Sequence, residues 1–157
     1  MGALLLLGWV MSVQAEPEGD YDVYGGWKKI QGKKTGFFHT EKVNGKWWII
    51  SPEGNVFFSK GVNSVHPPKK ESFGGTDADK AAESLKEWGM NTAGCWSDPD
   101  LLRLKVVVAL RPKTTVAGNK SFPDVFDPGW KSAVERNAQK ECSPFRNDPW
   151  VLGYFTD

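Results

Sequence analysis

The chain has 157 residues, which is enough for one ordinary domain with a sizeable hydrophobic core. Hydrophobic residues make up 39% and charged residues 25%, a balance that argues against wholesale disorder. The 20 basic and 19 acidic residues leave a formal net charge of +1, without the basic excess typical of nucleic-acid-binding proteins, so we expect no nucleic-acid partner.

Residues 1–15 have the pattern of a signal peptide. An apolar run from Gly2 to Met11 is too short to span a bilayer, and the small residues after it end at Ala15, as a signal peptidase requires. We therefore expect cleavage after Ala15, a secreted or periplasmic location, and no membrane association of the mature chain. No Lys or Arg precedes the apolar run, so either the signal is atypical or the true start lies upstream. A buried N-terminal helix is the alternative.

The mature chain is predicted to begin with a flexible segment, residues 16–34, followed by a β-hairpin over residues 35–54. Strand-forming residues lie on both sides of Asn44-Gly45. This pair is a strong hairpin signal because both residues tolerate the positive φ of a type I′ turn.

A second turn leads from the hairpin into a strand predicted over residues 55–65. Within the hairpin, Trp47 and Trp48 point to opposite faces of their strand, because successive strand residues alternate. One is expected in the core and the other against a neighbouring element. Eight tryptophans are many for this length, and Trp is frequent both in cores and at binding surfaces.

Helical periodicity appears after this strand. Apolar residues at helical spacing predict a helix over residues 76–88, with Trp88 on its apolar face. Asp98 and Asp127, each followed by proline, are typical helix starts, and the second of these helices is predicted to run to about Cys142.

Short apolar runs alternate with these helices and predict buried strands over residues 90–96, 106–110 and 150–155. The resulting order, β-α-β-α-β-α-β, predicts a parallel sheet with helical crossovers. Only residues 97–105 separate the second strand from the third, fewer than a crossover usually needs. The helix there must be short, or residues have been lost.

In parallel α/β folds, functional side chains gather at the carboxyl ends of the strands. The ends that can be located in this sequence carry Asn63, His66, Trp96, Arg111 and Asp157. These five residues are the candidate functional residues.

Several segments resemble agarase-like glycoside hydrolases. Residues 35–48 and 52–63 look like the part of that family that leads into its barrel. Residues 122–128 resemble the segment before its third barrel helix, and residues 148–157 resemble its fourth strand. The resemblance covers roughly residues 35–157. It implies an α/β fold, namely the first half of a (β/α)8 TIM barrel with about four β/α units, preceded by the β-hairpin.

The resemblance implies a retaining mechanism with two catalytic glutamates. One would follow the fourth strand, and the other would follow the seventh. A complete barrel typically needs ~250 residues, so we expect a truncated chain whose catalytic glutamates lie beyond Asp157. No catalytic residue is assigned within the chain, and the chain as written is expected not to hydrolyse polysaccharide. The expected partner is a galactose-containing polysaccharide or oligosaccharide.

The resemblance also suggests roles for the strand-end residues, and each role has a structural alternative. Asn63 and His66 would hydrogen-bond sugar hydroxyls, although His66 fits a plain surface loop equally well. Trp96 would stack on a sugar ring or lie in the core. Arg111 is a candidate substrate contact, and Asp157 would contact substrate or orient the site beside the acid/base.

We expect no metal and no cofactor, because His39 and His66 are the only histidines and no phosphate-binding glycine-rich loop occurs. Cys95 and Cys142 are expected to be free thiols, although an extracellular setting permits a bridge if their Cα atoms lie within ~7 Å.

Two other classes of protein remain open. The tryptophan-rich hairpin suits a non-catalytic carbohydrate-binding protein, but three predicted helices do not fit the β-sandwich of most binding modules. A structural, lipid-proximal protein held by an uncleaved N-terminal helix is the third hypothesis.

Overall fold

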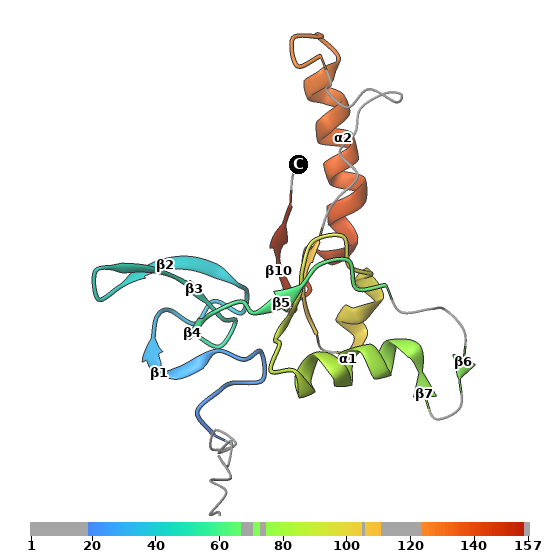
Figure 1. Ribbon diagram of the computed structural model, residues 1–157. Helices are drawn as coiled ribbons and strands as arrows, with labels where there is room; N and C mark the ends of the chain where they lie inside the picture. The colour runs from blue at the N-terminus through green and yellow to red at the C-terminus, as the bar shows by residue number, and fades with distance from the viewer. Residues whose placement is uncertain (1–18, 67–70, 73–74, 105, 111–123, 156–157) are drawn as a thin grey trace, which may run out of the picture.

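The computed structural model describes residues 19–66, 71–72, 75–104, 106–110 and 124–155. Within these residues the chain forms two four-stranded sheets side by side, together with a small two-stranded sheet of β6 (Glu71–Ser72) and β7 (Gly75–Thr76) (Figure 1). The predicted α/β class is confirmed.

The first sheet is antiparallel, with the strand order β1-β4-β3-β2. Its strands are β1 (Trp27–Gln31), β2 (His39–Val43), β3 (Lys46–Ile50) and β4 (Asn55–Phe57). The predicted hairpin is present, because β2 pairs with β3 from His39 opposite Ile50 to Val43 opposite Lys46. Asn44 and Gly45 have φ angles of 50° and 82°, as a type I′ turn requires.

The segment expected to be flexible, residues 16–34, contains a strand instead. β1 pairs with β4 and places Trp27 opposite Val56. The Asp22 carboxylate secures the loop before β1, because it accepts hydrogen bonds from the Gly26 N–H (2.8 Å) and the Asn55 side-chain amide (2.7 Å). Asn55 and the partner strand β4 are distant in sequence, which explains why local composition did not indicate the strand.

The second sheet is parallel, with the order β10-β9-β8-β5. Its strands are β5 (Gly61–Val62), β8 (Thr92–Ala93), β9 (Val107–Leu110) and β10 (Val151–Tyr154). The prediction of a single strand over residues 55–65 is wrong, because β4 belongs to the first sheet and β5 to the second.

The helices in the described residues are α1 (Asp77–Glu87), the 3-10 helix η1 (Pro99–Leu104), α2 (Trp130–Cys142) and the short η2 (Ser143–Phe145). The connection between β8 and β9 thus contains only η1, as its length predicted. Asp98 caps η1 as expected, because its carboxylate accepts the N–H of Asp100 (2.9 Å).

The main core lies between the parallel sheet and the elements α1 and η1. It consists of Ala82, Leu85, Ala93, Leu101, Leu102, Val106, Val108 and Leu110. Trp88 was predicted on the apolar face of α1, but its side chain is 67% exposed. The helix ends one residue before it, and Gly89 adopts a φ of 69°, which turns the chain away.

Helix α2 begins at Trp130, later than the sequence predicted, because the Asp127 carboxylate instead accepts the N–H of Gly129 in a turn (2.6 Å). None of its residues is buried, and the helix extends well beyond the parallel sheet (Figure 1). Strand β10 was predicted to be buried, but it lies at the edge of the sheet and is half-exposed.

Aromatic side chains connect the two sheets. The Tyr24 ring lies 5.9 Å from the ring of Phe38 in the first sheet's hairpin segment and 4.5 Å from the Trp150 ring, which directly precedes β10. Phe38 also stacks edge-on against Phe57 at 4.9 Å. In the described part of the chain, no helix has the length and apolar character needed to cross a bilayer.

Candidate functional site

The carboxyl ends of the parallel strands lie along one edge of the second sheet, as in other parallel α/β folds. The loops after β5 and β8 are joined there by backbone hydrogen bonds. The Ser64 N–H donates to the Cys95 carbonyl (2.9 Å), and the Asp98 N–H donates to the Val65 carbonyl (2.9 Å). The Val65 N–H also donates to the Ser97 hydroxyl (3.1 Å).

Trp96 forms an aromatic pair at this edge. Its ring centroid lies 5.9 Å from that of Phe155, the residue directly after β10. The two side chains are 43% and 46% exposed, so neither belongs to the core. The two rings are tilted by 53° to one another, so each half-exposed ring offers its own apolar face of the kind that stacks on the C–H face of a sugar.

Asn63 directly follows β5 and packs against the backbone of Gly94, which directly follows β8. Its side-chain oxygen occupies the place where a Cβ on Gly94 would be. Only glycine at residue 94 therefore leaves room for this placement. The Asn63 residue is exposed, so its amide can reach a bound ligand.

Two residues of this edge have a backbone conformation that L-amino acids rarely adopt. Ser64 has a φ of 58° and Trp96 a φ of 61°. Such residues cost ~1–3 kcal/mol each and concentrate at functional sites. Their position in the loops after β5 and β8 makes the carboxyl edge the strongest candidate site in the described chain.

The other predicted site residues lie apart from this group. His66 is exposed in the loop after β5. Arg111 and Asp157 lie outside the described residues. Phe155 was not predicted as a site residue, because it ends an apolar run that is typical of a buried strand.

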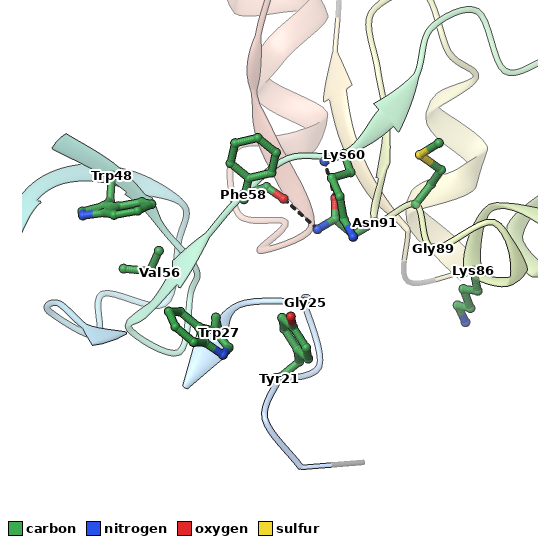
Figure 2. A pocket seen from close by; sticks show the side chains of 11 residues that line it. Tyr21, Gly25, Trp27, Trp48, Val56, Phe58, Lys60, Lys86, Gly89 and Asn91 are labelled. Atoms are coloured by element: carbon green, nitrogen blue, oxygen red, sulfur yellow. Dashed lines mark hydrogen bonds between the residues drawn. The ribbon is translucent and has the colours of Figure 1, made fainter. Parts of the chain in front are cut away.

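A second concave site lies at the opposite, amino end of the parallel sheet. It is a cavity of about 460 Å³ between that sheet and the first one, and Figure 2 shows the side chains around it. Lys60 directly precedes β5, and Asn91 directly precedes β8. Its lining consists of Tyr21, Gly25, Trp27, Trp48, Val56, Phe58, Lys60, Lys86, Gly89, Met90 and Asn91.

The thiols are free in the structure: Cys95 is buried, and Cys142 is half-buried. Burial raises the pKa of the Cys142 thiol, with a further contribution from the charge of Glu141, so this thiol is a poor nucleophile at neutral pH. Among the described residues, no group of three His, Cys, Asp or Glu side chains is placed to hold a metal.

Comparison with solved structures gives the class of the fold. The chain matches a crystal structure of the agarase AgWH50C with a TM-score of 0.71 and 17% identity, over 88% of this chain and 31% of that one. It matches a structure of an exo-β-agarase with a TM-score of 0.72 and 18% identity, over 88% of this chain and 32% of that one. At this identity the likeness shows the fold: the chain has part of the fold seen in agarases.

A sequence relative is more specific. The chain is 46% identical to Beta-agarase B of Vibrio sp. (strain JT0107), over 86% of this chain and 23% of that protein. The expected resemblance to agarase-like glycoside hydrolases is therefore confirmed. No protein-family model matches the chain. The chain spans about a quarter of this relative and a third of the structures, and the alignment extends over 223 residues, so the relative holds residues inside the aligned region that this chain lacks.

Proposed function

We propose that the chain is the N-terminal part of a secreted glycoside hydrolase that cleaves a galactose-containing polysaccharide of the agar type. The observation that carries this proposal is the 46% identity to a β-agarase over most of the chain. The four parallel strands, which neighbour one another in sequence order, agree with the first half of a (β/α)8 barrel, which is built by adding one strand after another.

The proposed mechanism uses two glutamates, one after the fourth strand of the barrel and the other after the seventh. One would protonate the glycosidic oxygen as the bond breaks, while the other attacks the anomeric carbon. Water, deprotonated by the first residue, would then release the sugar from the second. The carboxyl edge described above would supply binding contacts only. Asn63 would hydrogen-bond sugar hydroxyls, and Trp96 with Phe155 would stack on a sugar ring; His66, Arg111 and Asp157 stay as candidates.

Oligosaccharide binding by the carboxyl edge tests this proposal. The Trp96→Ala and Phe155→Ala variants of the chain should each bind an agar-derived oligosaccharide at least about fivefold more weakly, because each removes one ring of the pair. The control is Trp88→Ala, a 67% exposed Trp directly after α1 and away from this edge. Equal loss in all three variants would contradict a specific role for this edge.

A non-catalytic carbohydrate-binding protein is the rival function, supported by Trp47, which is 71% exposed in the first sheet. A longer polypeptide that continues past Asp157 would distinguish the enzyme from the binding protein. If it releases reducing sugar from agarose, the enzyme proposal holds. If it binds agarose without cleavage, the rival function is correct.

A further inference from the structure

We propose that the cavity at the amino end of the parallel sheet is a second glycan-binding site, which holds one or two sugar rings of the polysaccharide away from the carboxyl edge. This inference rests on the proposed function for its ligand class. Its geometry is independent of the carboxyl edge, because the two sites lie at opposite ends of the same strands.

The aromatic residues of the cavity share one face of the first sheet. Trp27 and Ile50 both pair with Val56, and directly paired residues of antiparallel strands point to the same side. Trp48 lies two residues before Ile50 and Phe58 two residues after Val56, so both belong to this face. Figure 2 shows the rings of Trp27, Trp48 and Phe58 around the opening, with Tyr21 below them.

This aromatic face is covered only in part. Ile50 and Val56 are buried on it, and Phe57 is buried on the other face, against Phe38. On the cavity side, Phe58 is 71% exposed and Tyr21 is also exposed. Aromatic residues gathered at solvent mark binding surfaces, because leaving them uncovered gains no stability.

The polar groups of the cavity suit hydroxyl-rich ligands. The Asn91 amide is committed to the wall, since it accepts the Lys60 N–H (2.8 Å) and donates to the Phe58 carbonyl (2.9 Å). The charged residues of the lining are Lys60 and Lys86, and the lining contains no Asp or Glu. Ammonium groups donate up to three hydrogen bonds each, which matches the hydroxyl oxygens around a sugar ring.

The walls of the cavity are closely packed where the loop before β1 meets Asn91. Gly25 has a φ of 88°, and a Cβ at this residue would come within 3.3 Å of the Asn91 Cβ. A side chain at residue 25 would therefore crowd Asn91, which directly precedes β8. A volume of about 460 Å³ lies within the ~300–1,000 Å³ typical of small-molecule sites. An apolar floor with a cationic rim matches a pyranose, which has an apolar C–H face and a polar edge.

Calorimetry of the full chain with a neutral agar-derived oligosaccharide tests the inference. Phe58→Ala and Lys86→Gln change exposed side chains, so both variants should fold. We expect each to weaken binding at the cavity by about fivefold to tenfold. The matched control is Trp47→Ala, a neighbouring ring of β3 that is 71% exposed on the opposite face and should leave binding unchanged.

The outcomes separate the two sites. If Trp96→Ala removes one binding event and Phe58→Ala removes another, both proposals hold. If Trp96→Ala abolishes all binding and Phe58→Ala has no effect, the cavity inference is wrong while the proposed function stands. Binding only to sulfated galactans, lost in 0.5 M salt, would overturn the inference too, because it would reflect ion pairing with the lysines rather than stacking.

Discussion

At the scale of single residues, Asp22 has more structural importance than its place in a loop suggests. Its buried carboxylate accepts four hydrogen bonds: from the N–H groups of Tyr24 and Gly26, from the Asn55 amide and from the Ser51 hydroxyl. A carboxylate is suited to this place because all of its partners are donors.

Asp22→Asn should lower the free energy of unfolding by about 1–3 kcal/mol. The substitution replaces one acceptor oxygen with an NH2 group, which is itself a donor and faces the existing donor groups. Urea unfolding of the chain measures this. Asp20→Asn is the control, since Asp20 forms a partly exposed ion pair with Lys29, and its loss should cost at most about 1 kcal/mol. Similar losses in both variants would show that the buried network adds no stability.

Some residues of the candidate site could be predicted from the sequence, and others could not. Asn63 and Trp96 could be predicted because strand ends can be located from apolar runs, and the structure places both at one edge. Phe155 was missed because exposure of its ring depends on β10 lying at the edge of the sheet. The amino-end cavity was missed because segments far apart in the sequence build it, and none has a motif of its own.

At the scale of elements, a strand's partner is harder to predict than the strand itself. The apolar pattern over residues 55–65 is continuous. The chain nevertheless leaves the first sheet after Phe57 and reaches the second sheet through Phe58, Ser59 and Lys60. The Asn44-Gly45 turn was predictable because its geometry is local. The early start of the first sheet was not, because β1 depends on the distant Asn55 and Ser51.

The parallel sheet depends on a glycine. A Cβ on Gly61 would overlap the Thr92 carbonyl oxygen, whereas a Cβ on Gly153 would meet nothing within 4 Å. Gly61→Ala should therefore force β5 away from β8 and cost about 3 kcal/mol or more, or prevent folding. Gly153→Ala should be close to neutral. Urea unfolding with far-UV circular dichroism compares them, and two equally stable variants would argue against this packing of β5.

The hairpin should contribute a pH-dependent term. Glu41 accepts the Lys33 N–H (2.7 Å) and contacts His39, and these interactions lower the pKa of its carboxyl below 4.5. A lowered folded-state pKa means that the stabilisation is complete above pH 4.5 and is lost as the pH falls through the folded value.

The wild-type chain should thus exceed Glu41→Gln in stability at pH 6, and the difference should shrink toward pH 3. Thermal unfolding at several pH values measures it. Glu53→Gln serves as the control, because no comparable contact is described for that side chain. A difference that stays constant with pH would show that the ionised form of Glu41 is not the stabilising one.

At the scale of the whole molecule, the proposed function gives this chain sugar contacts but no catalytic pair. We expect the purified chain to release no reducing sugar from agarose, because in the proposed mechanism both glutamates would belong to later barrel strands. A reducing-end assay against a known agarase tests this, with the longer product described above as the control. Measurable cleavage by the chain would contradict both the proposed barrel division and the proposed site.

The fold class could be predicted at this scale because the alternation of periodicities survives local errors in element boundaries. The nine-residue stretch between the second and third predicted strands stood out as too short, and the structure resolves it as η1 alone.

The order of the parallel strands has a consequence for synthesis on the ribosome. Because β5, β8, β9 and β10 neighbour one another in the order of translation, each new strand finds its pairing partner already made. The stretch between Leu110 and Val151 takes roughly 2–8 s to translate at ~5–20 residues per second. During that interval the open edge of β9 presents unpaired backbone groups to other nascent chains. Slow codons in this stretch would lengthen the exposure, so codon choice becomes a determinant of yield.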